Sequence, residues 1–352
     1  MSHSYTTIIY TLFFLIVFFT FIVEITNGKV IANVTVAADR SGNYTTVMEA
    51  VNAAPDNSMT RYVISIKKGI YVEKVFINEK KWNITMIGEG MGATIITGNM
   101  SCGQNKSNEC TYDSATFSVI GPRFIAQDIS FWNTAGPENC QALALKSDSD
   151  FSVFYRVEVS GHQDSLCVNT NRQFYRECKI SGSVDFIFGY ATVVFQNCTI
   201  LIKKGKPGQE NTITAQGGYL GIPSGFSFQF CNILADYDLL PLINSTSAFL
   251  GRPWKQNSTT IFMQSNISNV LSPKGWLEWE GAPEYLDTLF YAEYMNYGTG
   301  ANTTNRVKWS GYHLLNSSQA NNFTVANFIS GDQWLPSTGI PFTSGLENQI
   351  IT

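Results

Sequence analysis

The sequence predicts an all-β fold, a single-stranded right-handed parallel β-helix in which the chain winds repeatedly around one core. Three observations predict it. Short apolar strands separated by turn residues follow one another almost throughout, and charged residues make up only 14% of the chain, which is few for a helical protein. In addition, a degenerate sequence pattern returns at intervals of about 20 to 34 residues, the period of a solenoid coil.

The repeated pattern is an aromatic residue followed by polar and β-branched residues. It occurs as FIAQDIS, FYRVEVS, FYRECKI, FQNCTI, FQFCNI and FMQSNI, which begin at positions 124, 154, 174, 195, 228 and 262. A β-sandwich would also supply many short strands, but it does not require the same pattern once per turn. The parallel β-helix is therefore favoured.

Individual elements follow from local patterns. Helical periodicity appears over 44–54, between Ser41-Gly42 and Pro55. Strands are expected at 62–67, 83–87, 93–97, 115–120, 142–146 and 192–195. No Pro-, Ser- or charge-rich linker interrupts residues 29–352, so one domain is expected there.

The N-terminus carries an almost uninterrupted apolar run, residues 8–23, closed by Glu24 and small polar residues. This is typical of a signal peptide, which we place at 1–28. A retained signal anchor is the alternative, because no Lys or Arg precedes the run. Many N-x-S/T sequons support secretion. Removal of the peptide would leave a chain with no membrane segment.

Seven cysteines would meet an oxidising compartment, and their odd number leaves at least one thiol unpaired. Cys178, Cys198 and Cys231 occupy matching places in successive repeats, where neighbouring strands lie ~4.8 Å apart. Cys198 could pair with Cys231 or with Cys178, but not with both. We predict a disulfide between Cys198 and Cys231. The alternative is that the stacked thiols stay unreacted.

Several function classes lack their signals. A net charge of −4 gives no basic footprint for nucleic acid. G-x-S-x-G, H-E-x-x-H and paired C-x-x-C motifs are missing from the sequence, so neither a serine triad nor zinc is expected. The segment GEGMG (88–92) precedes a strand-like run rather than a helix, so we read it as a β-turn and not a dinucleotide loop. No cofactor or metal is expected.

Two aspartates carry the chemistry. Asp164 and Asp185 are 21 residues apart, one coil of the repeat, so parallel coils would stack them as neighbours. Like charges this close disfavour simultaneous ionisation and split the two proton affinities. Asp185 stands in an apolar run that requires a cationic partner. Turn caps are the structural alternative for both residues.

At these residues the chain resembles a known family. Gly69-x-Tyr71-x-Glu73, NTAGP (133–137), QALAL (141–145), GHQDSL (161–166), GSVDFIFG (182–189), ITAQG (213–217) and LGRPW (250–254) are, in this order, similar to the plant pectin methylesterases (pectinesterases), in the form without an inhibitor-like pro-region. The resemblance implies a catalytic domain over 29–352 that hydrolyses methyl esters of galacturonate in pectin. Methanol and pectate would be released in the cell wall, by a two-aspartate acyl-enzyme mechanism.

Carried over by position, the resemblance also implies roles for individual residues. They are Asp185 as nucleophile, Asp164 as proton donor and acceptor, Gln163 as transition-state stabiliser, and Gln141, Thr116, Arg252 and Trp254 as substrate-binding residues. These types fit the chemistry, because a guanidinium would keep Asp185 ionised and amides would donate to the oxyanion.

Three positions depart from the family pattern: His162, Cys167 and Tyr190. They are expected on the pectin groove, where they would alter substrate pattern and pH preference. We expect His162 at the mouth of the groove, so that its protonation changes the acidic limb of the activity profile.

Two rival functions remain. One is a β-helix enzyme that shortens pectin, as a glycosidase or a calcium-dependent lyase. The other is a non-catalytic wall-binding protein, suggested by the three departures. Pectin is the expected partner in each case, a proteinaceous pectinesterase inhibitor is a further candidate partner, and a monomer is expected.

Overall fold

The computed structural model describes residues 31–104, 110–218, 224–243 and 245–347. Asn33 to Thr352 form one compact unit. The predicted signal peptide, 1–28, lies outside the described residues. In the part of the chain that the structure describes, no helix is long and apolar enough to cross a membrane.

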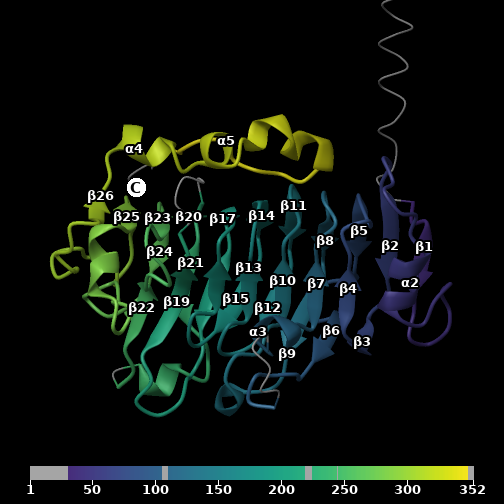
Figure 1. The fold of residues 1–352 in the computed structure, drawn as a ribbon, viewed down its shortest axis with the longest axis horizontal. Helices are drawn as coiled ribbons and strands as arrows, with labels where there is room; N and C mark the ends of the chain where they lie inside the picture. The colour runs from purple at the N-terminus through teal and green to yellow at the C-terminus, as the bar shows by residue number, and fades with distance from the viewer. Residues whose placement is uncertain (1–30, 105–109, 219–223, 244, 348–352) are drawn as a thin grey trace, which may run out of the picture. The chain divides into compact units, whose positions relative to one another are not determined.

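Three parallel sheets make up this unit, and Figure 1 shows their strands side by side along the solenoid. Sheet A contains β1 (Val34–Val36), β2 (Tyr62–Ile66), β5 (Ile84–Ile87), β8 (Ile125–Gln127), β11 (Ser152–Tyr155), β14 (Arg172–Arg176), β17 (Thr192–Gln196), β20 (Gly225–Gln229), β23 (Thr259–Met263), β25 (Phe290–Tyr294) and β26 (Tyr312–Leu314). Sheet B contains β3 (Gly69–Val72), β6 (Thr94–Gly98), β9 (Ser130–Asn133), β12 (Glu158–Ser160), β15 (Lys179–Gly182), β18 (Thr199–Ile202), β21 (Asn232–Ala235) and β24 (Asn266–Ile267). Sheet C contains β4 (Val75–Ile77), β7 (Phe117–Val119), β10 (Leu145–Ser147), β13 (Leu166–Val168), β16 (Ile187–Gly189), β19 (Asn211–Gln216) and β22 (Ala248–Gly251).

From β2 to β24 the chain visits the sheets in the order A, B, C and then returns to A, while β1, β25 and β26 add strands to sheet A at the two ends. The predicted right-handed parallel β-helix is therefore confirmed. The aromatic repeat of the sequence falls on the passage from sheet A to sheet B. One residue with a left-handed backbone turns each of these corners, at Asp128, Arg156, Glu177, Asn197, Phe230 and Gln264.

In five of the six repeats an aromatic residue stacks on its counterpart in the next coil: the leading Phe in four of them, and the second residue, Tyr175, in the repeat that begins at 174. From Phe154 to Phe262, five rings form a continuous column with centroid separations of 4.5, 4.9, 4.6 and 4.3 Å. The column lies inside the main hydrophobic core. Each ring buries apolar area and adds an aromatic contact worth about 0.5–1.5 kcal/mol, so the pattern specifies the coil register.

The helices are short. They are α2 (Val47–Ala53), α3 (Cys110–Asp113), α4 (Ser317–Asn321) and α5 (Val325–Phe328), with 3₁₀ turns η1 (Pro137–Asn139), η2 (Leu240–Leu242), η3 (Pro283–Asp287), η4 (Gly331–Gln333) and η5 (Leu335–Thr338). The expected helix over 44–54 is α2, which begins after a capping box of Thr46 and Glu49. The Glu73 carboxylate accepts from the main-chain N–H groups of Val47 and Met48, at 2.8 and 3.0 Å.

The C-terminal segment covers the outer face of sheet A. Figure 1 shows α4, α5 and the chain around them, in yellow, running across strands of this sheet. Val325 and Leu335 pack there against Val153 and Val194. Gln196 fixes the segment by hydrogen bonds to the main chain of Thr343.

The cysteines differ from the prediction. Strand pairing aligns Cys178, Cys198 and Cys231 in adjacent coils as expected, but Cys198 and Cys231 are free thiols. Their sulfurs lie within hydrogen-bonding reach of one another, and they also approach main-chain carbonyls, Cys198 that of Tyr175 at 3.5 Å and Cys231 that of Phe195 at 3.4 Å. The predicted Cys198–Cys231 disulfide is wrong for this structure, which matches the alternative of stacked thiols.

Candidate active site

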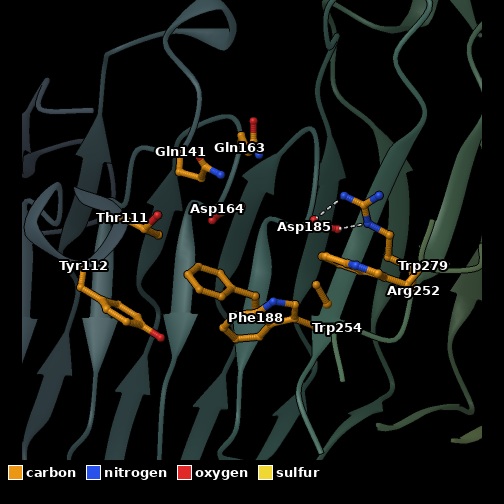
Figure 2. A pocket seen from close by; sticks show the side chains of 11 residues that line it. Thr111, Tyr112, Gln141, Gln163, Asp164, Asp185, Phe188, Arg252, Trp254 and Trp279 are labelled. Atoms are coloured by element: carbon orange, nitrogen blue, oxygen red, sulfur yellow. Dashed lines mark hydrogen bonds and ion pairs between the residues drawn. The ribbon is translucent and has the colours of Figure 1, made fainter. Parts of the chain in front are cut away.

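A pocket of about 430 Å³ opens on the outer face of sheet C. Figure 2 shows the side chains that line it. They are Thr111, Tyr112, Gln141, Gln163, Asp164, Asp185, Phe188, Ala215, Arg252, Trp254 and Trp279. Six of the seven residues predicted as catalytic or substrate-binding are thus brought together, although they come from segments up to 113 positions apart (141–254).

The two aspartates occupy equivalent places in neighbouring coils. Leu166 of β13 pairs with Ile187 of β16, so Asp164 and Asp185, each two residues earlier, lie one strand spacing apart, ~4.8 Å. Both have left-handed backbones, with φ of 61° and 50°. Asp adopts this conformation more readily than most residues, and here it turns the chain just before the sheet C strands β13 and β16. The two residues are 8% and 6% exposed.

Asp185 is held from two directions. Arg252 donates through Nε to Oδ1 at 2.9 Å and through Nη2 to Oδ2 at 2.6 Å. The Thr212 hydroxyl also donates to Oδ1, at 2.6 Å, and accepts from the Asp185 main-chain N–H. The three bonds donated to the carboxylate oxygens favour the charged form of such a group and fix its orientation.

Asp164 has the opposite electrostatics. Burial, followed by the negative charge of Asp185, raises its pKa well above the ordinary value of 3.8, and the more distant charge of Arg252 opposes this only partly. Arg252 itself is disfavoured as a cation by burial, but its hydrogen bonds to Asp185 outweigh this and raise its pKa. The site therefore pairs a carboxylate fixed by hydrogen bonds with a carboxyl group that keeps its proton to higher pH than usual.

Two amides complete the polar part of the pocket. Gln141 and Gln163 both line it, and Figure 2 places them near Asp164, away from Arg252. Primary amides can donate two hydrogen bonds each. Among the described residues no group of three His, Cys, Asp or Glu side chains could hold a metal ion.

An aromatic wall forms the rest of the pocket. Trp254 meets Phe188 edge to face, with centroids 5.9 Å apart, and packs on Tyr190 at 5.0 Å. Trp279 lies under the Arg252 guanidinium, 4.5 Å from its ring centroid. The ring restrains the guanidinium and adds a cation–π contact.

Two predicted site residues lie elsewhere. Thr116 is 3% exposed, and its hydroxyl donates to the main-chain oxygen of Trp132 at 3.0 Å. It does not line the pocket. His162 does not line it either, although its neighbours Gln163 and Asp164 do. The charged groups that act on the imidazole are Lys203, Asp238 and Asp236, so the expected place of His162 at the mouth of the groove is wrong.

The other two departures from the family pattern do adjoin the pocket. Cys167 is fully buried in the apolar cluster beneath it, with Phe188 and Ala215. Burial raises the pKa of this thiol. Tyr190 supports Trp254, as described above.

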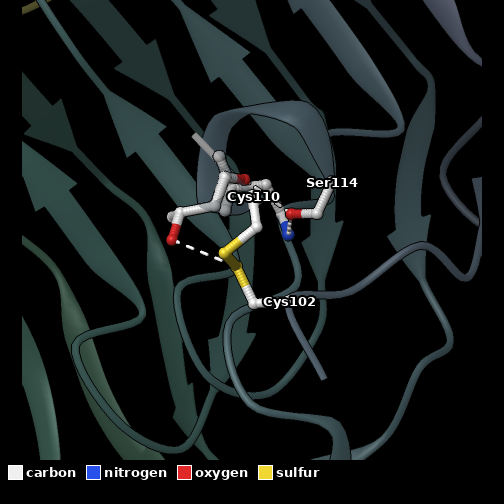
Figure 3. Close-up of a disulfide and its surroundings, with 5 residues drawn as sticks. Cys102, Cys110 and Ser114 are labelled. Atoms are coloured by element: carbon white, nitrogen blue, oxygen red, sulfur yellow. Dashed lines mark hydrogen bonds between the residues drawn. A yellow bond between two sulfur atoms is a disulfide. The ribbon is translucent and has the colours of Figure 1, made fainter. Parts of the chain in front are cut away.

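Several pocket residues were not predicted. Thr212 follows Asp185 by 27 positions, again one coil, and this spacing could have identified it. Trp279 comes from the long connection between β24 and β25, where no periodicity applies. Thr111 and Tyr112 belong to α3, which the Cys102–Cys110 disulfide ties to the chain before it (Figure 3). Ser114 closes this turn by donating to the Thr111 carbonyl at 2.6 Å.

Comparison with known proteins now identifies the chain. The pectinesterase family model matches residues 33–332. This chain belongs to the pectinesterase family. It is 58% identical over 322 residues to "Probable pectinesterase/pectinesterase inhibitor 44" of Arabidopsis thaliana and 60% identical over 312 residues to "Pectinesterase/pectinesterase inhibitor PPE8B" of Prunus persica. These matches cover 91% and 88% of this chain but 60% and 59% of the relatives, so the chain spans about three fifths of their length.

Solved structures agree with this family membership. The pectin methylesterase from carrot superimposes with a TM-score of 0.88 at 47% identity, covering 91% of this chain and all of that one. The pectin methylesterase from Aspergillus niger gives 0.75 at 29% identity, covering 88% of this chain and 97% of that one.

Proposed function

We propose that this protein hydrolyses methyl esters of galacturonate units in pectin, releasing methanol and leaving pectate. The observation that carries the proposal is the unequal pair of aspartates. Arg252 and Thr212 hold Asp185 as a carboxylate, whereas burial and the charge of Asp185 keep a proton on Asp164. An ester hydrolase needs both a nucleophile and a proton donor at neutral pH.

The first half-reaction forms an acyl-enzyme. A carboxylate oxygen of Asp185 attacks the ester carbonyl carbon, and the carbonyl oxygen becomes an oxyanion. The amides of Gln163 and Gln141 donate hydrogen bonds to that oxyanion. When the tetrahedral intermediate collapses, the bond to the methoxy oxygen breaks, Asp164 gives its proton to that oxygen, and methanol leaves. The product is an anhydride between Asp185 and galacturonate, beside an ionised Asp164.

The second half-reaction restores the enzyme. Asp164 takes a proton from water while the remaining hydroxide adds to the galacturonate carbonyl. Asp185 then leaves as a carboxylate and returns to its bonds with Arg252. The new galacturonic acid loses its proton to solvent, so Asp164 is again protonated and Asp185 again ionised. No step requires a group that this chain does not supply.

The aromatic wall is proposed to bind the sugar units. Trp254 and Trp279 present apolar ring surface on which pyranose rings stack. A related pectin methylesterase has been solved in complex with a hexasaccharide, at 25% identity and a TM-score of 0.73. Thr116 is not part of this proposal, because its hydroxyl is engaged by Trp132.

The remaining expectations are proposals of the same kind. Secretion to the cell wall would bring the enzyme to its polymer, and a single β-helix without an inhibitor partner would be active as a monomer. The names of several relatives include a pectinesterase inhibitor, which keeps an inhibitor protein as a candidate partner.

One assay tests the proposed function. The purified protein is incubated with highly methylated pectin, and both methanol and polymer length are followed. We expect methanol release with unchanged polymer length. Shortening of the chain would instead indicate a glycosidase or lyase, and neither product would indicate a wall-binding protein.

A further inference from the structure

A second pocket, of about 290 Å³, lies at the corner where the coils pass from sheet C to sheet A. Its lining includes Arg61, Asn83, Arg123 and Phe151 from the coils, and Trp334 and Thr338 from the C-terminal segment. None of these residues belongs to the catalytic pocket. The volume is near the lower end of small-ligand sites, about 300 Å³.

The coil residues of this pocket form a ladder. Strand pairing aligns Tyr62 with Ile84, Thr85 with Ile125, and Ile125 with Val153. The residues that precede these strands therefore stack in successive coils at ~4.8 Å intervals, in the order Arg61, Asn83, Arg123, Phe151 and Arg172.

The charges on this ladder are not balanced. Arg172 has its own carboxylate, because Nε and Nη2 donate to Asp150 at 3.0 and 2.7 Å. Arg61 instead donates to the main-chain oxygen of Arg123 at 2.8 Å and to the Thr85 hydroxyl at 3.3 Å. The Arg123 guanidinium has no hydrogen-bond or acidic partner among the described residues. Two neighbouring cations thus lack an anion, and burial followed by the charge of Arg123 lowers the pKa of Arg61.

The aromatic part of the pocket is rigid. Phe151 lies beneath the Arg172 guanidinium, 3.9 Å from the ring centroid, and meets Trp334 edge to face at 5.3 Å. The Trp334 Nε1–H donates to the Ile329 carbonyl at 3.0 Å. The exposed amide of Gln333 adds hydrogen-bonding groups beside the rings. The side chains of Asn83, Ser337 and Thr338 already donate to main-chain oxygens, so in the pocket the two hydroxyls can act only as acceptors.

From this arrangement we infer that the pocket binds a galacturonate unit of de-esterified pectin, a second polymer-binding site apart from the catalytic one. Guanidinium groups match a carboxylate in shape and charge. The aromatic rings suit the apolar face of a pyranose, and the amides and hydroxyls suit its hydroxyl groups. This ligand class rests on the proposed function, whose product carries that carboxylate, so the pocket would retain the enzyme on polymer that it has already processed.

The inference is tested by calorimetric titration of the full protein with trigalacturonate. We expect two classes of site in the wild type. The Arg123 side chain is exposed and has no hydrogen-bond partner among the described residues. Arg123→Gln should weaken trigalacturonate binding at one class of site by roughly tenfold or more, the loss expected for a hydrogen bond to a charged group. Arg61→Gln combined with Arg123→Gln should remove that class. Arg40→Gln, which removes an exposed arginine elsewhere, should change neither class.

Two further readouts separate the alternatives. Methanol release by the Arg123→Gln variant should keep the wild-type kcat, since this pocket lies outside the catalytic one, and methanol release by the wild type tests the proposed function independently of this site. Galactotriose and inorganic phosphate should bind the second class at least tenfold more weakly than trigalacturonate does. Equal binding of trigalacturonate by the wild type and both variants would overturn the inference, and so would equal affinity for inorganic phosphate, which would show an anion site without sugar recognition.

Discussion

Arg252 binds both carboxylate oxygens of Asp185, although the two residues are 67 positions apart in the sequence. Asp185 precedes β16, and Arg252 follows β22, two strands further along sheet C. Between these strands lies β19, which contributes Thr212 to the same carboxylate. Side chains from three consecutive coils therefore meet at the Asp185 carboxylate. Together they stabilise its position and its charge.

Replacement of Asp185 by Asn should abolish methanol release, because a neutral amide cannot attack the ester to form the anhydride. We expect a loss of at least about a thousandfold, as for other covalent nucleophiles. The variant should fold, since an amide still accepts from Arg252 and Thr212. Methanol release and circular dichroism of the purified variant check both points, and wild-type turnover would show that Asp185 is not the nucleophile.

Arg252→Lys should strongly lower the rate of methanol release, although it keeps the positive charge. An ammonium cannot make the two parallel bonds to Asp185 or lie flat on Trp279. A carboxylate displaced by about 1 Å costs on the order of a hundredfold in rate. Steady-state kinetics should show this loss mainly in kcat, and a variant that retains wild-type kcat across a pH series would argue against the pairing as the reason for the geometry.

Asp164→Asn should increase stability relative to the wild type as the pH rises, and it should lower activity. The raised pKa means that the folded state holds a proton that the unfolded chain releases above about 3.8. The protonated Asp164 therefore stabilises the folded state fully below pH 3.8, and this contribution is lost as the pH rises from there through the folded-state pKa. Asn removes this loss, so the variant should gain unfolding free energy relative to the wild type as the pH rises from 4 to 8.

The same variant should lose roughly a hundredfold or more in methanol release, because no group protonates the departing methoxy oxygen. Chemical denaturation at several pH values and parallel kinetics provide the two measurements. A stability difference between the variant and the wild type that stays constant from pH 4 to pH 8 would show that the pKa of Asp164 is not raised in the folded protein.

The fold could be predicted from the sequence because the aromatic residues that recur along the chain are also residues of the core. Phe154 and Phe228 recur in the sequence since each ring stacks on its neighbour in the next coil. The spacing of Asp164 and Asp185 was informative for the same reason, since one coil of sequence equals one strand spacing in the sheet.

The pocket residues that spacing could not predict lie outside the regular coils. Trp279 and Tyr112 reach the pocket from long connections whose paths have no period, and Arg252 was found only through the family motif. Matching places for Cys198 and Cys231 were correct, and the two side chains lie within hydrogen-bonding reach, but the sequence does not specify whether such neighbours are joined by a disulfide.

The Cys102–Cys110 disulfide should support the pocket as well as the fold. It closes a short loop, and its removal should cost about 2–3 kcal/mol of unfolding free energy. α3 would then be less well held, so Thr111 and Tyr112 should line the pocket less effectively and KM should rise. Cys102→Ser combined with Cys110→Ser is compared with Cys140→Ser, which removes a free thiol. Equal denaturation midpoints for the two proteins would show that the bridge is dispensable.

His162 should affect stability in acid and leave the pH dependence of catalysis alone. Burial, and then the charge of Lys203, lower the pKa of this imidazole from its ordinary 6.5, and its buried Nδ1 has no hydrogen-bond partner. The folded state thus binds this proton less readily than the unfolded chain, so the stabilising contribution is present above pH 6.5 and is lost as the pH falls below it. His162→Gln cannot titrate, so its unfolding free energy should fall less than that of the wild type between pH 7 and pH 5. Its profile of methanol release against pH should keep the wild-type acidic limb, because the side chain lies outside the pocket. A displaced acidic limb would show that the imidazole charge reaches Asp164, as the sequence alone had suggested.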